Sequence, residues 1–319
     1  MVILQTAPKT CTPLILHHEA DIVVKETKNI MMSSHIPGDD ENALAQPSHS
    51  SMVRLSYGSE TLQFGELHLP ARPGPFPTVI LIHGGFWRNP YGYTLMTSLA
   101  EDLAKQGIAA WNIEYRRVGD VGGGWPSTPL DVARAADHLR TIAHNYSLDV
   151  QRVVSVGHSA GGHLALWLAA RPRIPKDSIL AVSSHAGKEE DESAIPLPLV
   201  GVVSQAGVTD LEMAWIRNLG SGAVAELLGG SLQDIPERYA AASPAALLPL
   251  GVPQVLIHGT EDDRVPYIMS EEYAQAARAA GDQATLIKLE GADHFVHINV
   301  YSDAWARTVQ SVRQLVHLE

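Results

Sequence analysis

The stretch RVVSVGHSAGGHLALWLAA, residues 152–170, decides the fold of this 319-residue chain. A short, apolar, β-rich run ends at Gly157, and an apolar helical run begins just after Ser159. The residues between them, GHSAG at 157–161, match G-x-S-x-G, in which a serine sits on a sharp turn from strand to helix. Glycines two positions before and after the serine avoid clashes at a backbone forced toward positive φ. This context predicts Ser159 as a nucleophile, where the five letters alone would not.

Other short apolar runs resemble the one before Ser159, and helical patterns separate them. The runs are TVILIHG (78–84), IAAWNIEY (108–115), LVGVVSQAG (199–207) and PQVLIHG (253–259), and the helical patterns cover 93–105, 130–144, 161–170, 270–280 and 301–318. This alternation predicts an α/β fold, a mostly parallel twisted sheet with helices on both faces. Residues 53–70 predict an antiparallel hairpin before it. Ligands bind such sheets at the carboxyl ends of the strands.

Length and pattern predict one catalytic domain over residues 51–319. Residues 1–50 show no sustained period and predict a weakly ordered extension that could cover the active site. Two segments, 172–198 and 211–250, interrupt the alternation and predict lid-like insertions.

Composition narrows the class of partner. The formal net charge of -12, with no basic run to offset it, makes nucleic acid an unsuitable partner. No apolar stretch approaches the roughly 18 residues needed to span a bilayer, and no secretory leader is recognisable. With one cysteine, Cys11, the chain suits a reducing compartment. We therefore expect a cytoplasmic protein without a membrane partner; the sequence does not indicate an oligomeric state.

The glycine-rich run HGGFW (83–87) follows the predicted strand 78–82. Acyl transfer needs preset N–H donors for the tetrahedral oxyanion, and a glycine-rich turn can supply them. We assign the N–H groups of Gly85 and Phe86 as the first donors and that of Ala160 as the second source. His83 is expected to brace the loop rather than to transfer protons.

A serine hydroxyl needs a histidine base, and the base needs a carboxylate that fixes its tautomer. His294 in GADHF (291–295) is the predicted base because it follows the acid candidates in chain order, and His297 is the second choice. Local spacing leaves four acids open: Glu261, Asp262, Asp263 and Asp210. No histidine has metal-ligand spacing, so we expect neither a metal nor another cofactor.

Three aromatic side chains near the active edge are candidates for substrate contact. We assign Phe86, Trp87 and Trp125 as apolar pocket walls, with core packing an equal alternative for each. His158, beside the nucleophile, is also placed with the substrate-binding residues, and a structural role stays open for it.

The four segments HGGFW, GHSAGGH, HGTEDDRVP and GADHF together resemble the esterase and lipase-like branch of the α/β-hydrolase superfamily, over residues 60–318. This branch includes BD-FAE esterases, kynurenine formamidases and prolyl-oligopeptidase-like enzymes. The resemblance places the acid at Asp262, with Asp263 as the fallback. The stretch WNIEYRRVG (111–119) also resembles this branch, and we interpret it as packing and loop structure.

The resemblance implies a serine hydrolase that cleaves carboxylic esters of small or medium acyl groups through an acyl-enzyme. An aryl-formamide amidase is the alternative, because kynurenine formamidases often have H-G-G-Y-W where this chain has Phe86. Either activity implies a small-molecule ester or amide as the partner. A ligand-binding protein with a hydrolase fold is the non-enzymatic alternative, although such proteins usually lack a triad member.

Overall fold

A computed structural model describes residues 50–181 and 195–318 of the chain. These residues belong to one compact unit, Ala45–Glu319. The predicted N-terminal extension, except for its last residue, and the central part of the 172–198 insertion lie outside the described residues.

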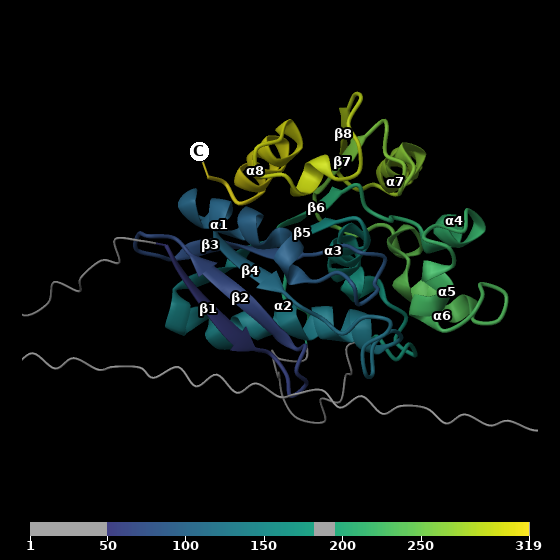
Figure 1. Cartoon of the computed structure of the whole chain (residues 1–319), viewed down its shortest axis with the longest axis horizontal. Coiled ribbons are helices and arrows are strands. Elements are labelled where there is room, and N and C mark those ends of the chain that lie inside the picture. Colours follow the sequence, from purple (N-terminus) through teal and green to yellow (C-terminus); the bar gives the residue numbers. More distant parts are fainter. Residues whose placement is uncertain (1–49, 182–194, 319) are drawn as a thin grey trace, which may run out of the picture. The chain divides into compact units, whose positions relative to one another are not determined.

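The described residues form one sheet of eight strands in the order β1-β2-β4-β3-β5-β6-β7-β8 (Figure 1). Neighbours from β4 through β3 to β8 are parallel, whereas β1 pairs with β2 and β2 with β4 in antiparallel register. The predicted mostly parallel sheet with an N-terminal antiparallel hairpin is therefore confirmed. The strands are β1 (Ser51–Ser56), β2 (Phe64–Leu69), β3 (Phe76–Ile82), β4 (Ala109–Ile113), β5 (Leu148–His158), β6 (Gly201–Gln205), β7 (Gln254–Gly259) and β8 (Ala284–Leu289).

The central strands are apolar on both sides because helices cover both faces of the sheet. Along β3, Ile80 and Ile82 join one hydrophobic cluster, and Val79 and Leu81 join another, as the two-residue period of a strand requires. Helices α2 (Ser127–Tyr146), α3 (Ala160–Ala170) and α7 (Tyr267–Ala279) contribute to the first cluster. Helices α1 (Thr97–Lys105) and α8 (Asp303–Leu315) contribute to the second. Short 3-10 turns η1 (Tyr93–Met96), η2 (Arg171–Arg173) and η5 (Val296–Ile298) lie between these elements.

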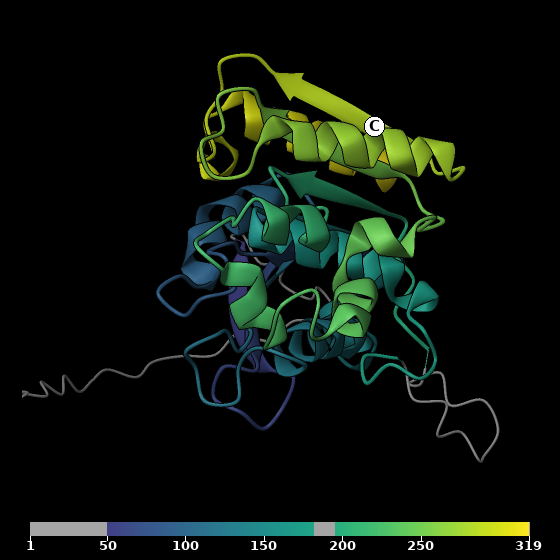
Figure 2. The same cartoon turned by 90° about the vertical axis from the view of Figure 1, so that its right-hand side faces the viewer.

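The insertion predicted at 211–250 forms three short helices and a 3-10 turn: α4 (Leu211–Ile216), α5 (Ala223–Leu228), α6 (Pro236–Ala242) and η4 (Pro244–Leu247). Figure 2 turns these green helices toward the viewer. The end of α6 is attached to α3, since Nε2 of His163 donates to the Ala242 carbonyl at 2.9 Å and Nε1 of Trp167 donates to the Ala241 carbonyl at 3.1 Å. At its α6 end the insertion is therefore anchored to the helix that follows Ser159.

Candidate active site

Ser159 lies between β5 and α3 with φ 58° and ψ -120°, the left-handed backbone of a sharp strand-to-helix turn. Gly157 and Gly161 flank the turn, and close contacts with neighbouring backbone atoms leave no room for a side chain at either position. A Cβ atom at Gly157 would lie 2.1 Å from the Gly161 carbonyl oxygen, and one at Gly161 would lie 2.0 Å from that of Ile82. Both distances are far inside van der Waals contact, so the strained turn accepts no larger residue at either position.

His294 follows β8, and its Nδ1 atom lies 2.7 Å from Oδ2 of Asp262, on the loop after β7. Oδ1 of Asp262 accepts the backbone N–H groups of Arg264 and Val265, each at 2.8 Å. Burial opposes ionisation of Asp262, but hydrogen bonds from His258 and His294 outweigh it and hold the pKa of this carboxyl far below its usual range. An ionised Asp262 only accepts, so Nδ1 of His294 carries a proton, and in the neutral ring this tautomer leaves a lone pair on Nε2.

The other acid candidates point elsewhere. Asp263 pairs with Arg264 at 3.3 Å and leaves 70% of its side chain exposed. Asp210 caps α4 by accepting the N–H groups of Glu212 and Met213. Among the four candidates, the structure brings Asp262 to His294 and gives the other three no hydrogen bond to it.

Two further histidines lie near His294: His158 contacts its ring, and His297 contacts the ring of His158. His158 is buried, its Nε2 donates to the His294 carbonyl at 2.8 Å, and the two ring centroids are 4.6 Å apart. Burial, with repulsion from His294, lowers the pKa of His158 to about 3, so His158 is neutral at ordinary pH. The ring of His297 is buried and has no hydrogen-bond partner for either nitrogen in the described structure. Hydrogen bonding therefore links Asp262 to His294 and not to His297.

The loop after β3 lies directly against Ser159. A Cβ atom at Gly84 would lie 2.9 Å from Cβ of Ser159 and 2.7 Å from the His158 carbonyl oxygen. The next three residues have positive φ: 113° at Gly85, 50° at Phe86 and 57° at Trp87. The predicted donors Gly85 and Phe86 directly follow Gly84 on this sharply curved backbone.

The predicted pocket walls differ in where they lie. Trp87 is only 1% exposed, and its Nε1 donates to Nδ1 of His163 at 3.2 Å, so it packs in the core, which is the alternative that the sequence leaves open for it. Phe86 is half-buried and packs against Gly220. Trp125 is half-buried and borders a cavity of about 400 Å³ beside α6, with the Arg238 guanidinium 5.5 Å from its ring.

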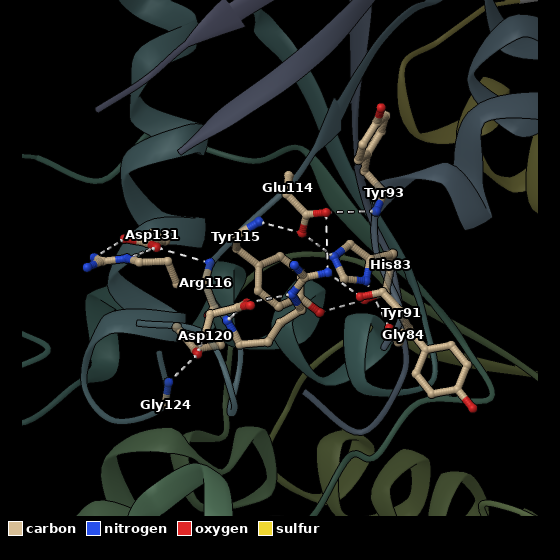
Figure 3. Close-up of polar contacts among 12 residues, drawn as sticks. His83, Gly84, Tyr91, Tyr93, Glu114, Tyr115, Arg116, Asp120, Gly124 and Asp131 are labelled. Atoms are coloured by element: carbon tan, nitrogen blue, oxygen red, sulfur yellow. Dashed lines mark hydrogen bonds and ion pairs between the residues drawn. The ribbon is translucent and has the colours of Figure 1, made fainter. Parts of the chain in front are cut away.

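Glu114 and Tyr115, in the stretch interpreted from the sequence as packing and loop structure, form hydrogen bonds with His83 at the start of the HGGFW loop. Nε2 of His83 lies 2.9 Å from Oε1 of Glu114, and the Tyr115 hydroxyl donates to the His83 carbonyl at 2.8 Å (Figure 3). The sequence carries a signal for this contact: Glu114 directly follows β4, and β4 lies next to β3, the strand that leads into HGGFW.

Within residues 50–181 and 195–318, no helix combines the length and apolar character needed to cross a membrane. In the same part of the chain, no three His, Cys, Asp or Glu side chains are grouped so that they could hold a metal ion.

The family model of BD-FAE matches residues 66–276, which include the HGGFW loop, the Ser159 turn and Asp262. The chain belongs to the BD-FAE family. Its fold and relatives agree with an esterase-like α/β-hydrolase: a solved carbohydrate esterase from gut microbiota, in truncated form, superposes with a TM-score of 0.70 at 22% identity, covering 86% of this chain and 99% of that one.

Curated relatives of this BD-FAE protein are distant and longer. Esterase LipQ of Mycobacterium tuberculosis is 26% identical over 261 residues, which is 77% of this chain and 56% of LipQ. The non-reducing polyketide synthase Preu6 of Preussia isomera is 24% identical over 285 residues, 74% of this chain. The match spans only 13% of Preu6.

Proposed function

We propose that this BD-FAE protein is a serine hydrolase that cleaves carboxylic esters through Ser159, His294 and Asp262. The observation that carries the proposal is the 2.7 Å contact between His294 and Asp262, which leaves Nε2 of His294 as a proton acceptor beside the Ser159 turn. The esterase relatives and the esterase-like fold support the same reaction class.

In the proposed reaction, Nε2 of His294 takes the proton of Ser159 as Oγ attacks the ester carbonyl. The tetrahedral intermediate collapses when the carbon–oxygen bond to the alcohol breaks, and His294 returns the proton to the departing alcohol. Water then attacks the acyl-enzyme carbonyl with the same histidine as base. The bond from the carbonyl carbon to Oγ of Ser159 breaks, His294 returns the proton to Oγ, and the carboxylic acid leaves. Asp262 stabilises the imidazolium in both halves of the reaction. These steps require no cofactor.

The N–H groups of Gly85, Phe86 and Ala160 are the proposed donors to the oxyanion. Support comes from the loop contact at Gly84 and from the position of Ala160 as the first residue of α3. The free N–H groups at a helix start also favour developing negative charge. Removing one such donor typically costs about 100-fold or more in rate.

Access to the reacting groups favours a small or medium acyl group. Ser159 is 2% exposed and His294 is 3% exposed, so a short acyl chain reaches them more readily than a bulky one. A formyl group satisfies the same restriction. Because Phe86 keeps an aromatic ring where formamidases often have tyrosine, aryl formamides are the second candidate substrates.

The test is a substrate panel on the purified chain, with Ser159→Ala as the blank. It compares p-nitrophenyl acetate, butyrate and a long-chain ester with N-formylkynurenine. We expect the short esters to give the highest kcat/KM. Turnover of the formamide alone overturns the ester assignment in favour of the amidase, and equal rates for Ser159→Ala overturn the serine mechanism.

A further inference from the structure

Glu114 is the centre of a buried hydrogen-bond network behind the oxyanion loop (Figure 3). The residue is 4% exposed, and each of its carboxylate oxygens meets two partners. Oε1 faces Nε2 of His83 at 2.9 Å and the Tyr115 N–H at 2.9 Å; Oε2 faces the Tyr93 N–H at 3.2 Å and Nη1 of Arg117 at 3.3 Å. The two backbone N–H groups and the guanidinium are donors that cannot accept, so Glu114 is a carboxylate.

The ring of His83 is fully buried, and both of its nitrogens face oxygen acceptors. Nδ1 lies 2.8 Å from the Gly84 carbonyl oxygen, and Nε2 faces Glu114. A neutral imidazole has one N–H and could satisfy only one of these contacts, whereas an imidazolium satisfies both. Burial alone would raise the pKa of Glu114, but the hydrogen bond and charge of His83, with the charge of Arg117, hold it below the ordinary value.

The contact to Gly84 orients the peptide that follows it. The Gly84 carbonyl and the Gly85 N–H belong to one planar trans peptide, so they point in opposite directions. Because the oxygen points at Nδ1 of His83, the Gly85 N–H points away from His83. Gly84 itself lies against Ser159, so this peptide begins at the loop residue that contacts the Ser159 turn.

The same network holds the far end of the loop. Nη1 of Arg117 donates to the Tyr91 carbonyl as well as to Glu114. Tyr91 in turn packs on the loop, since a Cβ atom at Gly85 would lie 2.5 Å from Cβ of Tyr91. Glu114 thus ties together residues before and after the curved segment 85–87.

We propose that His83 and Glu114 form a buried imidazolium–carboxylate pair that positions the Gly84–Gly85 peptide for the oxyanion. Both are positioning residues, because the pair holds the Gly84 carbonyl oxygen at Nδ1 of His83. This inference rests on the proposed function, because the oxyanion forms only if Ser159 attacks a carbonyl.

The experiment compares Glu114→Gln with Asp131→Asn. Asp131 is a matched control: it is fully buried and is bonded to the Arg116 guanidinium at 2.7 and 2.8 Å, but it has no hydrogen bond to the oxyanion loop. An arylboronic acid, which forms a tetrahedral adduct with a catalytic serine, reports on oxyanion binding, and KM for p-nitrophenyl acetate reports on the ground state. We expect Glu114→Gln to weaken boronate binding and lower kcat about 10-fold or more, with a much smaller change in KM.

Equal losses of boronate affinity per folded molecule in the two variants, or a parallel change of KM and boronate affinity in Glu114→Gln, overturn the positioning role. A wild-type chain that neither turns over esters nor binds the boronate overturns the proposed function and this role with it.

A second measurement uses the wild-type chain and does not depend on a variant of Glu114. Nitrogen-15 NMR of the histidine rings, with His83→Gln to assign the signal, should find a proton on both ring nitrogens of His83 at neutral pH. A His83 ring with one unprotonated nitrogen overturns the ion pair, whatever the kinetic outcome.

Discussion

Nδ1 of His294 donates to Oδ2 of Asp262 at 2.7 Å, while the other oxygen of Asp262 is held by two backbone N–H groups of its own loop. The loop after β7 therefore orients the carboxylate through its own backbone, independently of the histidine. A carboxylate fixed in this way sets the tautomer of His294, and the free lone pair on Nε2 is what a serine nucleophile requires.

Asp262→Asn should lower kcat on a short ester by about 10⁴-fold, because an amide can donate toward Nδ1 and stabilise the wrong tautomer. KM should change little. Steady-state kinetics with p-nitrophenyl butyrate measure both constants. The neighbouring variant Asp263→Asn is the control, since that side chain is 70% exposed and pairs with Arg264. Equal losses in the two variants would contradict the assignment of the acid.

Gly84→Ala should reduce kcat/KM by about 100-fold, because the added methyl group meets Cβ of Ser159 at 2.9 Å and the His158 carbonyl oxygen at 2.7 Å. The oxyanion loop then has to move away from the nucleophile. Gly230→Ala is the matched control: the nearest neighbour of its methyl group is the flexible side chain of Ile235, at 3.1 Å. Thermal melting separates a loss of stability from a loss of activity. A Gly84→Ala enzyme that is folded and fully active would show that activity does not depend on the position of this loop.

Acidification should destabilise the fold between pH 7 and pH 5 through its buried histidines. Burial lowers the pKa of His163 from 6.5 to about 4 and that of His158 to about 3, so the unfolded chain binds protons that the folded chain does not. The stabilisation is complete above the unfolded value of 6.5 and is lost as pH falls toward the folded values. Each histidine contributes up to about 1.4 kcal/mol per pH unit in this window.

Urea unfolding at pH 7, 6 and 5 measures this loss. His163→Gln should flatten the slope of unfolding free energy against pH, because one protonatable group is removed. An unchanged slope in that variant would mean that His163 is not held neutral in the folded chain.

The fold could be predicted because the apolar runs are short, β-rich and separated by helical patterns. A run such as TVILI, apolar at every position, needs cover on both faces, and β3 indeed contributes alternate residues to two hydrophobic clusters. The nucleophile turn could also be predicted, since its glycines are fixed by contacts that any such turn makes.

The acid and the loop environment could be predicted only in part. Three adjacent acids share one loop, and which of them faces His294 depends on the turn geometry that brings two N–H groups to Asp262. The side chain of Trp87 lies in the core, and the backbone there has a φ of 57°. No local sequence pattern predicts that this side chain points inward. The contact between Glu114 and His83 could not be predicted from local spacing, because the two residues are about thirty positions apart in sequence and sheet topology brings them together.

The measurement that tests the central claim most directly is labelling with a fluorophosphonate probe followed by peptide mass spectrometry. The account predicts one adduct per chain, on Ser159, with no labelling of Ser159→Ala and slow labelling of His294→Ala. An adduct on another residue, or Ser159→Ala labelled as fast as the wild type, would contradict the identification of Ser159 as the nucleophile.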